Sequence, residues 1–165
     1  MTEGGVLTAG HVGAERLHQL LTRCGLSLEM LPDDASITAS YWGDPEAGVV
    51  GSAVYARNDT PVHSVLHEAC HILCMDAGRR RSLERDAGGD DLEEAAVCYL
   101  QIVLADHIDG VSSARLMSDM DAWGYSFRLG STRRWFEEDA GDARRWLQGH
   151  GLLTSERQPG FRCRN

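Results

Sequence analysis

The chain has 165 residues, a length that one domain with its own hydrophobic core can fill without disulfides. Its hydrophobic content of 42% and charged content of 25% are ordinary for a soluble globular protein. The net charge of −9 argues against nucleic acid as a partner and leaves no basic patch for a membrane surface.

The N-terminal residues, the length of the apolar runs and the cysteines indicate in which cellular compartment the protein is expected. The first ten residues lack the basic and apolar regions of a secretory signal, and no apolar run approaches the roughly 20 residues of a membrane span. The cysteines occupy irregular positions, which favour a reducing compartment over a disulfide framework: Cys24, Cys70, Cys74, Cys98 and Cys163. We therefore expect a cytoplasmic protein.

The N-terminal half predicts one helix and a small sheet. Residues 1–10 are expected to form a loose tail, and the apolar spacing of residues 12–24 predicts a helix that Gly25 ends. Alternating apolar residues between turn-forming residues then predict three short strands, over residues 26–31, 36–42 and 49–57.

The C-terminal half predicts mostly helices. The first covers residues 60–75 and is followed by a polar segment, residues 76–89, expected to be a surface loop. Further helical stretches are predicted over residues 91–106, 111–121 and 132–148, before a loose tail that begins at residue 152. This order of elements indicates a single α+β domain over residues 1–165.

The most informative pattern is H-E-x-x-H, which His67, Glu68 and His71 form within the predicted helix. Residues four apart on a helix lie one above the other, so both imidazoles can converge on one metal ion. Glu68 lies about 100° round the helix from His67, where it can take a proton from a water molecule that the metal activates. The motif therefore predicts a catalytic zinc site, which usually needs a third protein ligand.

The segment L-E-E-A-A-V-C-Y-L, which starts at Leu92, resembles the segment that follows H-E-x-x-H in gluzincin metallopeptidases, including the compact ImmA-like proteins. This resemblance covers residues 48–101. It implies a zincin-like fold in which residues 49–57 form an exposed edge strand along the substrate cleft. It also makes Glu94 the third Zn²⁺ ligand, with the adjacent Glu93 as the alternative. Where some gluzincins have an aspartate that orients a histidine, this chain has Cys98.

These residues together predict a zinc-dependent metallopeptidase that hydrolyses a peptide or protein substrate. His67, His71 and Glu94 are the expected metal ligands, and Glu68 is the expected general base. Two other functions remain open. The domain could bind zinc and act as an inactive regulatory or interaction module of the same fold, or it could be a helical interaction partner without a metal.

The other candidate site residues belong to less specific sequence patterns. Tyr125 is preferred as the hydrogen-bond donor to the transition state because Gly124 allows an unusual backbone beside a cleft. Chemically equivalent candidates are His107, Arg128 and His150. His63, Cys70 and Cys74 are interpreted as ordinary helix residues. Glu93 is expected to point towards solvent, and the buried face of its helix is predicted from Leu92, Ala96, Tyr99 and Val103.

Overall fold

The computed structural model describes residues 5–83 and 89–164 of the chain. Two N-terminal helices, α1 (Ala9–Val12) and α2 (Ala14–Arg23), come before the sheet. The expectation of a loose tail does not hold for residues 5–10, because their backbone bonds to distant parts of the core. The Leu7 N–H donates to the Asp119 carboxylate (2.9 Å), and the Ala9 N–H donates to the carbonyl of Thr60 (2.8 Å). Residues 1–4 of that predicted tail lie outside the described residues.

The sheet of the described chain has three strands in the order β1 (Ser27–Met30), β3 (Ala53–Ala56) and β2 (Gly48–Val50). β1 runs parallel to β3, and β2 runs antiparallel to it. Leu28, Val54 and Val49 lie opposite one another across the three strands, and all three are buried. Because directly paired residues share a face, this row is the side of the sheet that packs on the helices.

Two of the three predicted strands are wrong. Residues 36–42 form turns, in which the Asp44 carboxylate accepts a hydrogen bond from the Ile37 N–H and Ala39 has a φ of 58°. Residues 49–57 form a hairpin instead of one strand, because Gly51, with a φ of 59°, turns the chain between β2 and β3. The resulting edge strand β2 is short, and Ser40 bridges to its first residue.

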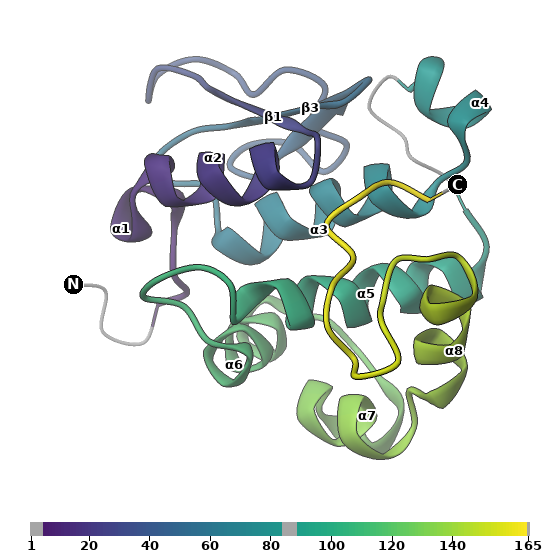
Figure 1. The fold of residues 1–165 in the computed structure, drawn as a ribbon. Helices are drawn as coiled ribbons and strands as arrows, with labels where there is room; N and C mark the ends of the chain where they lie inside the picture. Colours follow the sequence, from purple (N-terminus) through teal and green to yellow (C-terminus); the bar gives the residue numbers. More distant parts are fainter. Residues whose placement is uncertain (1–4, 84–88, 165) are drawn as a thin grey trace.

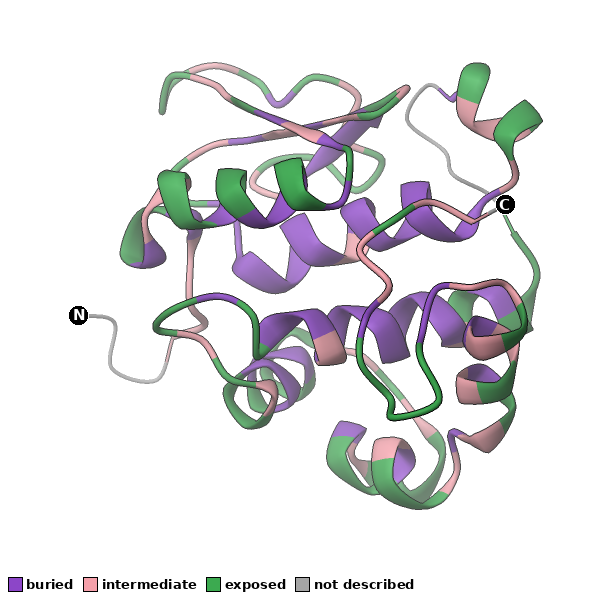
Figure 2. Cartoon of the chain, viewed as in Figure 1, coloured by how far each residue is buried: buried purple, intermediate pink, exposed green. Residues whose placement is uncertain are grey.

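Two helices, α3 (Val62–Cys74) and α5 (Asp91–Ala105), lie side by side through the middle of the molecule (Figure 1). The sheet and α2 lie on one side of α3. On the other side, α5 packs against α6 (Ser113–Trp123) and α8 (Gly141–Gly149). Neighbours on two sides leave both central helices buried over most of their surface (Figure 2). Both were predicted to within about two residues at each end.

The shorter helices differ more from the sequence predictions. α4 (Ala77–Arg81) lies within the segment expected to be a loop, of which residues 84–88 lie outside the described residues. The predicted helix over residues 132–148 is divided into α7 (Thr132–Glu138) and α8, since Asp139 leaves helical geometry with a φ of −133°. A 3₁₀ turn, η1 (Arg128–Gly130), precedes α7.

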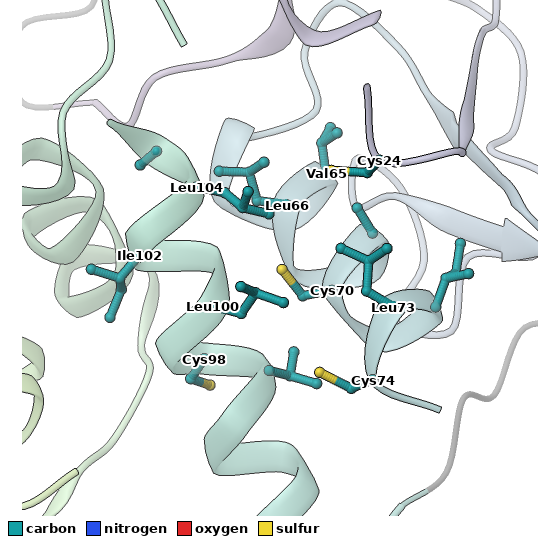
Figure 3. Packing of buried hydrophobic residues seen from close by; sticks show 14 of the residues in the cluster. Cys24, Val65, Leu66, Cys70, Leu73, Cys74, Cys98, Leu100, Ile102 and Leu104 are labelled. Atoms are coloured by element: carbon teal, nitrogen blue, oxygen red, sulfur yellow. The ribbon is translucent and has the colours of Figure 1, made fainter. Parts of the chain in front are cut away.

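Small apolar side chains fill the space between α3 and α5. Cys70 from α3 and Leu100 from α5 both point into it, whereas Ile102 points away from α3 (Figure 3). The predicted buried face of α5 is only partly right, because Ala96 and Tyr99 are buried while Leu92 is 41% exposed. All five cysteines are free thiols. Burial raises the pKa of the Cys70 thiol well above its usual value, as expected of a cysteine that serves as a small hydrophobic residue.

The C-terminal segment crosses both central helices and is not the loose tail that was expected (Figure 1). Leu152 and Leu153 are buried, and the Arg164 N–H donates to the carbonyl of Leu73 (2.8 Å). The Arg164 guanidinium donates to the carbonyl of Cys74 at the end of α3 (3.1 Å). The segment therefore satisfies carbonyls that the last turn of a helix leaves without partners.

Helices and a small mixed sheet together place the fold in the α+β class. Among the described residues, no helix combines the length and the apolar character needed to cross a membrane.

Candidate metal centre

The two histidines of the H-E-x-x-H motif lie one turn apart on α3, with their rings at an interplanar angle of 86°. Their Nε2 atoms are 3.2 Å apart. Both side chains are largely buried, at 13% exposed for His67 and 9% for His71, so their positions are set by packing. The helical spacing thus brings the two imidazoles to one point, as the motif predicted.

Glu94 reaches the same point from the first turn of α5. Its Oε1 lies 3.0 Å from His67 Nε2, and its Oε2 lies 3.1 Å from His71 Nε2. Burial alone would raise the pKa of Glu94, but hydrogen bonds from His67 and His71 outweigh it and hold that pKa well below its usual range. The structure therefore places Glu94, rather than Glu93, beside the histidine pair.

Glu93 does not point towards solvent, so that expectation is wrong. Its side chain is only 6% exposed and accepts hydrogen bonds from both terminal nitrogens of Arg79, at 2.8 and 2.7 Å. The Arg164 guanidinium lies 3.6 Å away on the other side. The expectation failed because α4 and the C-terminal segment cover this side of α5, and neither contact is visible in a helical pattern.

Gln101 determines which nitrogen of His67 can bind a metal. The amide nitrogen of Gln101 donates to the backbone carbonyl of His63 (3.2 Å), which fixes the orientation of the amide. Its oxygen then lies 2.7 Å from His67 Nδ1 and accepts the proton of that nitrogen. In a neutral His67 the lone pair therefore lies on Nε2, facing Glu94, whereas in a protonated ring Nε2 donates to Glu94 instead.

Cys98 also lies at the centre, one turn after Glu94 on α5. Its Sγ and single ligand atoms of His67 and Glu94 all lie within 4.8 Å of one another. This residue occupies the place where some gluzincins have an orienting aspartate. Here that role belongs to Gln101, and the thiol is a potential ligand.

Glu68 is buried on α3 and has neither a hydrogen bond nor an ion pair from any residue in ranges 5–83 and 89–164. Burial raises its pKa, and the charges of His67 and His71 oppose that shift. Its side chain lines the cavity described below, and groups with a shifted pKa beside a cavity concentrate at functional sites.

A cavity of about 370 Å³ opens beside these residues. Its walls combine carboxylates with aromatic rings. The described residues that line it, none of which is an arginine, are Trp42, Glu46, Ser64, His67, Glu68, Glu94, Trp123, Gly124 and Tyr125. Burial raises the pKa of Glu46, and the nearby indole N–H of Trp123 opposes that effect. The cavity is large enough for a small ligand or one or two residues of a peptide.

Tyr125 is the one of the four candidate donors that lines the cavity. It follows Gly124, which ends α6 in the left-handed conformation (φ 115°), and its N–H donates to the carbonyl of Met120 (3.0 Å). The other three candidates contact groups elsewhere. His107 packs on Phe161, Arg128 pairs with Asp139, and His150 packs on Trp146.

The sequence placed Gln101 on the same face of its helix as Glu94 and Cys98, but its role was missed, as were two other contributors to the cavity. Gln101 lies seven residues after Glu94, two helical turns further on the same face, so its spacing could have indicated a role. Glu46 and Trp42 lie in turns that were assigned to a strand and its end, where no periodic pattern indicates a position in space.

Comparisons of the chain with protein-family models, with curated proteins and with solved structures found no match. The function is therefore argued from the residues of the centre and their geometry.

Proposed function

We propose that this protein is a zinc-dependent metallopeptidase of the gluzincin type with a zincin-like α+β fold. His67, His71 and Glu94 hold the ion, and Glu68 transfers the proton. The observation that carries the proposal is the convergence of two imidazole nitrogens and the two oxygens of Glu94, joined by contacts of 3.0–3.2 Å, next to a buried glutamate and an open cavity.

The chemistry of these atoms supports a cation between them. Since Gln101 accepts the Nδ1 proton of His67, the Nε2 lone pair of a neutral His67 faces a carboxylate oxygen at 3.0 Å. Two acceptors at that distance repel each other unless a proton or a metal ion lies between them. In a tetrahedral zinc site with bonds of about 2.0–2.2 Å, neighbouring ligand atoms are about 3.3–3.5 Å apart. The distances of 3.0–3.2 Å between the nitrogen and oxygen atoms in this structure would have to increase only slightly.

A zinc ion bound there supplies a Lewis acid that lowers the pKa of water towards about 7 and polarises a carbonyl group. Glu68 accepts the proton of the attacking water and passes it to the leaving amine. Its burial suits this role, because a raised pKa makes the carboxylate a better proton acceptor.

The cavity beside Glu68 is the proposed substrate site, and the gluzincin resemblance makes a peptide bond the expected substrate. Pairing of the substrate with a long edge strand is not part of the proposal, since β2 is short and Ser40 covers its first residue. The five free cysteines support a reducing compartment such as the cytoplasm.

The test compares Glu68→Gln with Glu29→Gln, a matched change at an exposed glutamate on β1. Zinc content is measured by elemental analysis, and hydrolysis is measured with a library of quenched fluorescent peptides. We expect one zinc ion per chain in all three proteins and a loss of activity of about 100-fold or more in the Glu68 variant only. Equal hydrolysis by the Glu68 variant and the parent would refute the mechanism.

Cys98 favours a second candidate function, a zinc-binding module without activity. Its Sγ is close enough to His67 and Glu94 to complete a four-ligand site, and structural zinc sites have four protein ligands. Cobalt substitution separates the two functions. A thiolate-to-cobalt charge-transfer band that disappears in Cys98→Ser would support the closed site, and its absence supports the open, catalytic one.

A further inference from the structure

His63 is a buried histidine that the proposed mechanism does not use. It lies one turn before His67 on α3 and is 1% exposed. Its Nδ1 lies 3.1 Å from the hydroxyl oxygen of Tyr125. Its Nε2 is buried and has no hydrogen-bond partner in the described part of the chain.

The unpaired Nε2 indicates where the proton of His63 lies. A neutral imidazole carries one proton, on either Nδ1 or Nε2. A proton on Nε2 would be a buried donor without an acceptor, whereas a proton on Nδ1 can be donated to Tyr125. Buried donors without partners are rarer than acceptors with a lone pair to spare. Burial lowers the pKa of His63 to about 3, and the nearby His67 adds to the shift, so the ring is neutral at neutral pH.

Gln101 holds the backbone of His63 in place. Its amide nitrogen donates to the backbone carbonyl of His63 at 3.2 Å. When the Tyr125 oxygen accepts the Nδ1 proton of His63, its own proton must point elsewhere.

We propose that His63 is a positioning residue, which donates its Nδ1 proton to Tyr125 and thereby directs the Tyr125 O–H into the cavity beside Glu68. There the hydroxyl binds the carbonyl oxygen of the substrate and stabilises the negative charge that develops on it. This role for the substrate rests on the proposed function, while the position of the proton on His63 does not. Burial raises the pKa of Tyr125 to about 12, so the hydroxyl keeps its proton at neutral pH.

The proton position is tested on the wild-type protein by ¹⁵N–¹H correlation NMR of the imidazole nitrogens. A His63→Gln sample assigns the signals. We expect Nδ1 of His63 to carry the proton and Nε2 to lack it, with or without bound zinc. A proton on Nε2 would overturn the proposal, whatever the protein hydrolyses.

The consequence for catalysis is tested with two substitutions of similar size. His63→Asn keeps an N–H donor near the position of Nδ1, and His63→Leu removes it. We expect His63→Leu and Tyr125→Phe each to lower kcat by about 100-fold with a nearly unchanged KM. His63→Asn should keep most of the activity. The double variant that combines His63→Leu with Tyr125→Phe should lose no more than either single variant.

These outcomes separate the positioning role from the proposed function. If the parent hydrolyses peptides while His63→Leu matches it in kcat, the positioning role is wrong and the metallopeptidase proposal stands. If the leucine and asparagine variants lose activity equally, His63 contributes to packing alone. If the parent hydrolyses nothing, the proposed function fails, and the NMR result still decides where the His63 proton lies.

Discussion

Two adjacent glutamates at the start of α5 differ in their exposure and in the residues that neutralise their charge. Glu93 is 6% exposed and is held by two arginines, Arg79 at 2.7 Å and Arg164 at 3.6 Å. Glu94 is 49% exposed, and its ion-pair partners among residues 5–83 and 89–164 are the imidazoles of His67 and His71. Neighbouring helix residues point about 100° apart, which is enough to send one carboxylate into the protein and the other into the cavity.

This difference separates a structural charge from a reactive one. Guanidinium groups keep their charge at any accessible pH, so the partners of Glu93 neutralise it permanently. Imidazoles can give up their protons, so the partners of Glu94 can exchange a proton for a metal ion. Exposure of the carboxylate gives that ion a route in. A buried carboxylate with arginine partners therefore indicates stability, and a half-exposed one with histidine partners indicates a metal site.

The largest expected effect is the loss of zinc from Glu94→Ala. Removing one of three ligands should weaken zinc binding by well over 100-fold, more than changes to groups that only orient a ligand. Competition with a chromophoric chelator measures the affinity. Zinc binding as tight as in the parent would show that the third ligand lies elsewhere, with Cys98 as the first residue to test.

The matched change at the neighbouring position should affect stability instead. Glu93→Gln removes the buried negative charge that Arg79 and Arg164 contact, so we expect a loss of about 2–3 kcal/mol in the free energy of unfolding. Urea denaturation of the zinc-free protein measures it. The zinc affinity of the folded variant should stay within a few-fold of the parent. If this variant loses zinc while Glu94→Ala keeps it, the roles of the two glutamates are reversed.

The comparison also shows what the sequence could predict. The H-E-x-x-H spacing and the face shared by Glu94, Cys98 and Gln101 are local properties of helices, and the structure brings these residues together as that geometry requires. The ends of α3 and α5 were predicted to within about two residues for the same reason.

Features that depend on distant contacts were not predictable in this way. The burial of Glu93 depends on Arg164, which is 71 positions away in sequence. The hairpin of β2 and β3 was missed because the segment was interpreted as one run of strand-forming residues. The buried Val49 and Val54 are five positions apart, so they are out of phase in a period-two pattern, and this change of phase marks the turn at Gly51. The ordered C-terminal segment was missed because it is held by distant backbone contacts, such as those of Arg164 with the carbonyls of Leu73 and Cys74.

A smaller effect is expected from Gln101, which connects His67 of the candidate metal centre to the backbone carbonyl of His63. Gln101→Leu removes the acceptor for the Nδ1 proton of His67, so the ring is free to adopt the tautomer that cannot bind a metal through Nε2. We expect zinc affinity to fall by about 10-fold to 100-fold. Leu20→Met is a suitable control, because it alters packing on α2, remote from the centre. A Gln101 variant with unchanged affinity would mean that packing alone fixes His67.

The smallest expected effect concerns His63, a buried group that stays neutral, in contrast to the charged Glu93 and Glu94. His63 has a folded pKa of about 3, below its ordinary value of 6.5, because burial disfavours the charged ring. Below pH 6.5, His63 therefore binds a proton in the unfolded chain but stays neutral in the folded chain. The stability from this group is complete above pH 6.5 and is lost progressively as the pH falls towards 3. By pH 5.5 the loss is about 1.4 kcal/mol.

Urea unfolding of the zinc-free parent and of His63→Asn at pH 7.5 and 5.5 isolates this contribution, because the other titratable groups of the chain are the same in both proteins. The parent should lose about 1 kcal/mol more than the variant on acidification. Equal losses would mean that His63 takes up a proton in the folded state. An imidazolium there would carry a proton on Nε2 that has no acceptor among the described residues, so the cavity side of the molecule would then hold a buried charge as the Glu93 side does, but one that is only partly hydrogen-bonded.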